Sequence, residues 1–148
     1  MKGLIEFSLE GQKQLVRKFR GIQIAGNNWK STFTKIGKDL TGCFSGPVFE
    51  TRGAEIGEPW KARTKSYPWE ILEKSGAMRK GFKYNADRMS VKIWNITDYF
   101  KFHQSRKPRR KLPRRVMLKL DNKRKTLIMK RLHQDLYLKL KGKGLWTI

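Results

Sequence analysis

The sequence predicts an α+β protein in which a small antiparallel sheet is packed against N-terminal helices and a C-terminal helix, with one long aromatic loop. Three patterns predict this class. Apolar residues recur at helical spacing in residues 12–40, residues 81–94 alternate with a period of two, and a helical pattern follows residue 121. The chain has 148 residues, which fits one domain, so we expect residues 1–148 to share one core.

The N-terminal part predicts one strand and two helices. Residues 4–8 alternate weakly, as in a short edge strand, and residues 12–22 have helical spacing. A second helix follows Asn28, a suitable N-cap, and ends at the turn signals Thr41-Gly42 or 45–47. One stripe of this helix carries Trp29, Phe33, Ile36 and Leu40. Such a stripe is typical of a helix that faces the core.

Residues 44–69 predict a long loop, because glycines and prolines interrupt every periodic pattern there. The loop also carries large aromatic residues. Exposed aromatic side chains promote aggregation unless something covers them. We therefore expect the loop to be pinned to the body or to meet a partner, with Trp60 and Trp69 as candidate contact residues. A short helix is expected at residues 69–74.

The second half predicts a β-hairpin, a further strand and a last helix. Residues 81–84 and 89–94 alternate around the turn formers 85–87, and the side chains expected to face the helices are those of Met89, Val91 and Ile93. Residues 116–120 alternate again and predict a strand that pairs with the hairpin.

The last helix is capped by Asp121 or Asn122 and ends at Gly142. Its apolar stripe consists of Ile128, Leu132, Leu136 and Leu140. Residues 141–148 form an apolar C-terminal tail, and we expect Trp146 to dock on a groove of its own or of a neighbouring chain.

The chain is strongly basic, with 35 Lys and Arg residues against 12 Asp and Glu residues and a formal net charge of +23. This excess favours a polyanionic or acidic partner, either nucleic acid or protein. The densest basic stretch follows an aromatic segment at residues 99–104. We interpret it as an outward-facing docking surface, consisting of Arg106, Lys107, Arg109, Arg110, Lys111, Arg114 and Arg115.

Nothing in the sequence indicates catalysis, a cofactor or a metal ion. The Asp and Glu residues are scattered singly, so no acid–base pair or divalent-cation site is predicted. One Cys and two His residues are too few for structural zinc. We expect His103 to bond a backbone carbonyl and Gln104 to hold the chain as it leaves the core.

No membrane segment or signal peptide is expected. No apolar run approaches the ~20 residues that a membrane helix needs, and the N-terminus has no signal-peptide apolar segment. The single Cys43 leaves no internal disulfide to form. We expect the protein to be made in a cytosol-like compartment.

Four motifs in a fixed order give the chain a family resemblance over residues 36–140. They are Gly57-Glu58-Pro59-Trp60 with Thr64, then 72–79 with Gly81-Phe82, then 99–104 ending in His-Gln, and finally 112–116. In this order the sequence resembles the phage virion morphogenesis proteins, the tail-completion group of Mu-like and P2-like phages. The family motifs match this chain at Gly76, Tyr99, His103, Gln104 and Pro113. It departs from the family where Ser105-Arg106-Lys107 replaces a glycine after His-Gln.

The resemblance implies a structural, non-enzymatic virion protein of the tail or neck, assembled in the host cytoplasm. It implies a ring of identical copies, with a hexamer among the candidate symmetries, that joins head to tail. The implied partners are the connector, the tail tube and packaged DNA. The alternative is a small basic protein that binds DNA without sequence preference, because the charge alone fits both functions.

Overall fold

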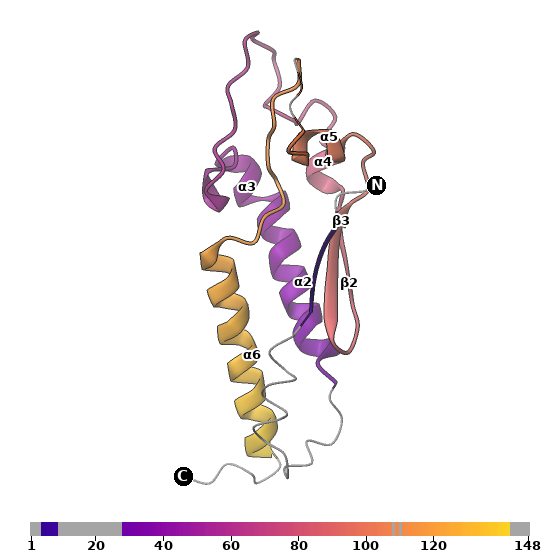
Figure 1. Ribbon diagram of the computed structural model, residues 1–148, viewed down its shortest axis with the longest axis vertical. Helices are drawn as coiled ribbons and strands as arrows, with labels where there is room; N and C mark the ends of the chain where they lie inside the picture. Colours follow the sequence, from indigo (N-terminus) through magenta and orange to yellow (C-terminus); the bar gives the residue numbers. More distant parts are fainter. Residues whose placement is uncertain (1–3, 9–27, 108, 110, 143–148) are drawn as a thin grey trace.

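The computed structural model describes residues 4–8, 28–107, 109 and 111–142, and it has an α+β fold, as the sequence predicts. The longest elements are two helices, α2 (Lys30–Ser45) and α6 (Asn122–Gly142). In Figure 1 they run side by side along the long axis of the molecule, with the sheet on the other side of α2. The helix expected at residues 12–22 lies outside the described residues, as does Trp146.

A three-stranded antiparallel sheet forms one layer. β1 (Leu4–Ser8) and β2 (Phe82–Ala86) flank the central β3 (Ser90–Asn95), which confirms both the hairpin and the edge strand. The hairpin pairs Tyr84 with Ile93. Of the predicted turn formers, Asn85 and Ala86 belong to β2, whereas Asp87 starts the turn, because its carboxylate accepts hydrogen bonds from the backbone N–H groups of Met89 and Ser90.

The four large side chains of the predicted α2 stripe are all buried, and two of them, Ile36 and Leu40, line a cavity against α6. Helix α2 also packs closely on the sheet. Gly37 allows the close approach, since a Cβ there would lie only 2.5 Å from Cδ2 of Tyr84 and 3.0 Å from Cγ2 of Val91. The helix begins one residue later than predicted. Trp29 occupies the N-cap position, while the Asn28 side chain accepts a hydrogen bond from the Lys30 N–H at 3.0 Å.

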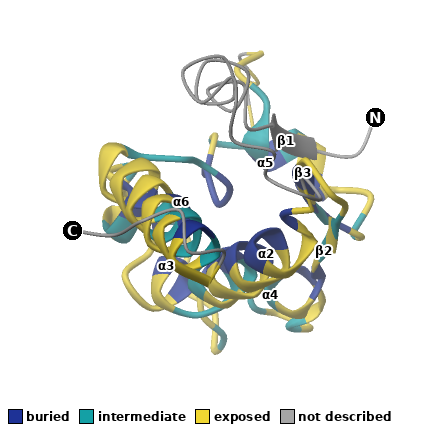
Figure 2. Ribbon diagram, turned by 90° about the horizontal axis from the view of Figure 1, so that it is seen from below, coloured by how far each residue is buried: buried dark blue, intermediate teal, exposed yellow. Residues whose placement is uncertain are grey.

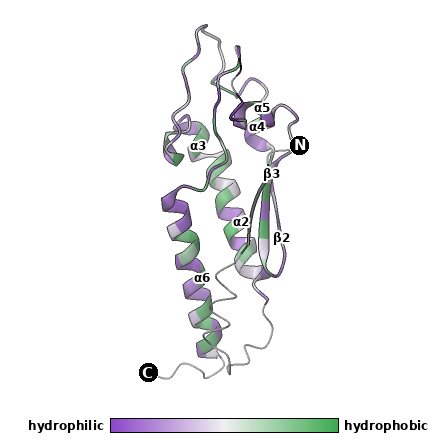
Figure 3. Cartoon of the chain, viewed as in Figure 1, coloured by the Kyte–Doolittle hydropathy of each residue, from purple (hydrophilic) through white to green (hydrophobic). Residues whose placement is uncertain are grey.

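Helix α6 covers the other side of α2. Buried Leu132 and Leu140 form the centre of its inner face, as predicted, and Asp135 accepts a 2.6 Å hydrogen bond from the Thr32 hydroxyl on α2. The Asp121 side chain accepts a bond from the Arg124 N–H in the first turn. Figure 2 shows buried residues on the facing sides of α2 and α6, and Figure 3 shows hydrophilic and hydrophobic residues alternating along α6.

The prediction of one loop at residues 44–69 is wrong for its first half. Pro47 starts the short helix α3 (Pro47–Glu50), and the 3-10 helix η1 (Ala54–Ile56) follows. Gly53 permits the turn between them with a φ of +83°, and Phe49 and Ile56 are buried in the core. The part after η1, from residue 57 on, is irregular.

Three other local predictions are also wrong. Residues 69–74 form no helix; the short helix α4 (Ala77–Lys80) comes later and begins after Gly76. Residues 116–120 are extended but pair with no strand in the described part of the sheet, because side chains of another segment take up their backbone groups. Met89 precedes β3 and is 40% exposed, whereas Val91 and Ile93 are fully buried as expected.

Candidate functional site: a basic cleft between two loops

Helix α5 (Phe100–Gln104) anchors the segment that returns from the basic stretch. The Gln104 side chain donates to the Leu118 carbonyl at 2.6 Å and accepts the N–H groups of Met117 at 3.0 Å and Leu118 at 3.3 Å. The His103 carbonyl accepts the Arg115 N–H at 3.0 Å. Gln104 thus makes the hydrogen bonds that a neighbouring strand would make to this segment, which confirms that Gln104 holds the chain at the core.

The ring of His103 is buried and neutral. Burial and the neighbouring charges of Arg115 and Arg109 lower its pKa to about 4, because each disfavours the imidazolium. The Pro113 backbone opposes this shift. Nδ1 of His103 is buried without a hydrogen-bond partner among the described residues, so the expected bond to a backbone carbonyl stays a prediction, while the burial of the ring fits a structural role.

Two loops meet beyond α5 and enclose a cleft of about 430 Å³. One loop is residues 61–67, the other residues 109–115, and in Figure 1 they lie side by side at the upper end of the molecule. Six cationic residues line this basic cleft: Lys61, Arg63, Lys65, Arg109, Lys111 and Arg115. Among the residues that the structure describes, none of those lining the cleft is Asp or Glu. The arrangement can attract and hold a polyanion.

Arg115 joins the two loops. Its side chain is buried, and Nε and Nη2 donate to the Lys61 carbonyl at 3.2 and 3.0 Å. Burial lowers the pKa of Arg115, and the nearby charge of Arg63 adds to this effect. Arg115 is therefore an internal clamp, and its prediction as an outward-facing contact is wrong.

Aromatic rings hold the other arginines of the cleft. Arg63 lies over the ring of Tyr67 at 5.4 Å and donates a 2.7 Å hydrogen bond to the Trp69 carbonyl. Tyr67 in turn stacks on the half-buried Trp69, whose ring has the Lys74 ammonium 5.1 Å from its centroid. Arg109 lies over Phe102 at 4.2 Å. Trp69 thus supports the cleft.

The remaining predicted contact residues divide into two groups. Arg106, Lys107 and Arg114 are exposed but do not line the cleft. The first and last of these lie near Glu58, a carboxylate whose pKa is lowered mainly by its hydrogen bond to Lys119 and further by these arginines. Their charge is therefore partly compensated within the chain. Arg110 lies outside the described residues.

Trp60 is a core residue, so its prediction as a contact is wrong. Only 8% of it is exposed, its ring meets Phe49 edge to face, and Nε1 donates a 2.7 Å hydrogen bond to the Val116 carbonyl. This bond fixes the start of the first loop against the end of the second. Aromatic side chains with a polar group are well suited to such a position, because they bury a large apolar surface and still bond a carbonyl.

Three further motif residues shape the surroundings of α5. Gly76 has a φ of +69°, a conformation that side chains disfavour, and it turns the chain into α4. Tyr99 is exposed at the N-cap of α5, and Pro113 lines the cleft. Sequence reasoning missed Lys61, Arg63 and Lys65. Their signal was the basic spacing in KARTK directly after Trp60.

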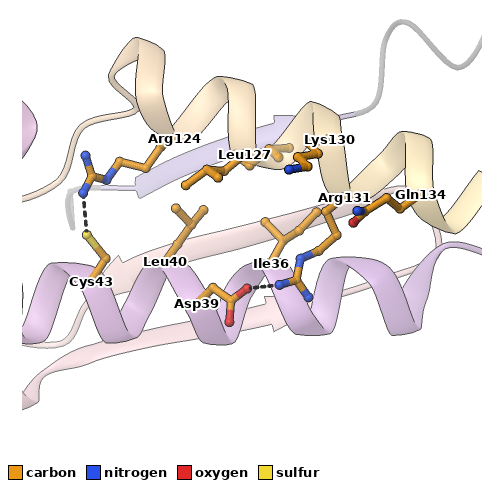
Figure 4. Close-up of a pocket in the computed structure, with 10 residues that line it drawn as sticks. Ile36, Asp39, Leu40, Cys43, Arg124, Leu127, Lys130, Arg131 and Gln134 are labelled. Carbon is orange, nitrogen blue, oxygen red and sulfur yellow. Dashed lines mark hydrogen bonds and ion pairs between the residues drawn. The ribbon is translucent and has the colours of Figure 1, made fainter.

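A second cavity, of about 250 Å³, lies between α2 and α6 (Figure 4). Of its charged groups, only Lys130 has no ion pair or hydrogen bond with another described residue, and the other three already have partners. Arg131 pairs with Asp39 at 2.6 Å, and Arg124 donates to the Cys43 sulfur at 3.2 Å while also bonding Glu55. This cavity offers no free charge comparable to the basic cleft.

Within the described residues, no group of three or more His, Cys, Asp and Glu side chains is arranged to hold a metal ion. In that same part of the chain, no helix has both the length and the apolar composition needed to cross a membrane.

Comparison of the chain with protein-family models, with curated proteins and with solved structures finds no match.

Proposed function

We propose that the chain is a structural virion protein of a tailed phage, a tail-completion or neck subunit that docks through the basic cleft. The observation that carries this proposal is the cleft itself. Two loops, joined by a hydrogen bond between residues 54 positions apart in sequence, are fastened into one basic surface at one end of an elongated body. Such a surface gives an assembly protein both association rate and partner selectivity.

The motif residues support the same function. In the sequence they follow the order of the tail-completion family, and in the fold three of them, His103, Gln104 and Pro113, lie at the cleft or bond the segment that returns from it. Gln104 holds the returning segment, and Pro113 forms part of the cleft wall. These roles are mechanical, which suits a virion component and requires no reaction.

In this proposal several copies form a ring, with a hexamer among the candidate symmetries, between the connector and the tail tube. A ring requires one heterologous interface repeated around an axis. The sheet edges offer a candidate interface, since β1 and β2 each have one neighbour in the described sheet. The basic clefts of all copies would then face the same way.

The test replaces cleft cations in a phage that encodes this chain. The cleft variant carries Lys61→Gln, Lys65→Gln, Arg109→Gln and Lys111→Gln, all at exposed side chains. A matched control removes the same charge elsewhere, away from the sheet edges, with Lys35→Gln, Lys38→Gln, Lys125→Gln and Lys130→Gln, also exposed. We expect unjoined heads and tails, counted by electron microscopy, to accumulate only with the cleft variant. Normal joining with the cleft variant refutes the docking role.

The second candidate function is a small DNA-binding protein, and the net charge of +23 favours it. Sizing chromatography, combined with binding assays on tails and on free DNA, distinguishes the two candidate functions. A ring-sized species that binds tails supports the virion protein, whereas a monomer that binds free DNA and ignores tails supports the alternative.

A further inference from the structure

We infer that the partner of the basic cleft is the phosphate backbone of duplex DNA, contacted without reading the base sequence. The inference rests on the docking role proposed above and names the partner of that same site.

The first argument is charge density. Six cations surround a cleft of about 430 Å³ whose lining contains no carboxylate. Duplex DNA carries about one negative charge per 1.7 Å of its axis, so its backbone can place several phosphates along such a surface. An acidic protein surface usually mixes both signs of charge. An all-cationic lining therefore fits the phosphate backbone better.

The second argument is the number of cations that are free to meet phosphates. Arg63 and Arg115 are held by backbone carbonyls. Lys61, Lys65 and Lys111, by contrast, are exposed and form no ion pair with another described residue. The cleft thus combines two arginines held by the backbone with three exposed lysines that are available to phosphates.

The third argument distinguishes duplex from single-stranded DNA. Single-strand binders stack bases on open aromatic faces. Here the Tyr67 ring already contacts Arg63 and Trp69, although 45% of Tyr67 is exposed. The Trp69 ring contacts Tyr67 and the Lys74 ammonium, and Arg109 lies over Phe102. Because each ring already holds a cation, it is less available as a platform for bases, which favours backbone contact with a duplex.

The test measures fluorescence anisotropy of purified protein with a random-sequence duplex, with a single strand of the same length and with a polyglutamate peptide. Each titration is repeated over a series of salt concentrations. We expect the duplex to bind most tightly and independently of its sequence, with log K falling linearly against log salt.

The cleft and control variants defined above then locate the binding site. Each phosphate contact contributes a slope of about 0.9, so the cleft variant should lose a slope of about 3 to 4 and at least about a hundredfold in affinity at 100 mM salt. The control variant has the same net charge and should lose a slope of less than about 1. Thermal melts verify that both variants fold.

Three results would overturn the inference: equal losses in both variants, tighter binding to the single strand, or tighter binding to polyglutamate. The joining experiment and the DNA-binding experiment test separate claims, and their outcomes can differ. If the cleft variant abolishes head–tail joining but binds duplex as the wild type does, the docking role stands and DNA is not the partner. If it loses DNA binding but joins normally, the cleft binds DNA and the proposed virion function is wrong.

Discussion

Replacing Gln104 with Ala tests whether one side chain anchors the basic loop to the core. The substitution removes three hydrogen bonds and leaves the N–H groups of Met117 and Leu118 and the Leu118 carbonyl without partners. Both residues are buried. An unpaired buried group costs about 1 to 3 kcal/mol, and the space vacated by the half-buried glutamine admits some water, so we expect a total loss near the low end, about 2 to 4 kcal/mol.

Chemical denaturation of Gln104→Ala measures this loss directly, and a thermal melt should fall by about 6 to 12 °C. Amide hydrogen exchange at Met117 and Leu118 should accelerate more than exchange in α2, because the anchor is local. Gln134→Ala, at an exposed position on α6, serves as the control and should change stability by less than about 0.5 kcal/mol. If Gln104→Ala changes the unfolding free energy by less than about 0.5 kcal/mol, the anchoring role is refuted.

Three further predictions concern the core and its pH dependence. His103 has a folded pKa of about 4, below its ordinary 6.5, so the unfolded chain takes up a proton first as pH falls. The unfolding free energy should therefore drop by on the order of 2 kcal/mol between pH 7 and pH 4, after allowance for solvent screening. Denaturant titrations at several pH values measure this drop, and in His103→Gln the part that is due to His103 should be absent. Trp29→Ala should cost about 3 to 5 kcal/mol, and an unchanged melt would contradict its place in the core. Gly53→Ala should cost about 2 to 4 kcal/mol in the same assay, because φ is +83° and a Cβ would lie 2.1 Å from the Glu58 carbonyl oxygen; a smaller loss means that the turn can relax.

The sequence predicted the parts of the fold that depend on local periodicity. The stripe of α2, the hairpin and the last helix follow from the spacing of apolar residues, and each is present. The segment after Phe44 was mispredicted because its elements are single turns started by Pro47 and Gly53, which are too short to show a period. Their stability comes from burial of side chains such as Ile56.

The candidate site was only half predictable. Arg109 and Lys111 were found because they belong to a dense run, but Lys61 and Lys65 reach the same cleft from another loop. Composition also cannot separate an exposed arginine from a buried one. Arg115 resembles its neighbours in sequence, yet a bond to a distant carbonyl makes it part of the interior.

The clamp between Arg115 and the Lys61 carbonyl has a consequence for the order in which the chain folds during synthesis. During synthesis the first loop leaves the ribosome long before the second, and domains acquire structure as the chain emerges. Until Arg115 and Val116 are available, neither that loop nor Trp60 has its fixing bond. A polypeptide truncated before Arg115 therefore lacks the bonds that hold the two loops of the basic cleft together, and under the proposed function such a chain would have no complete docking surface.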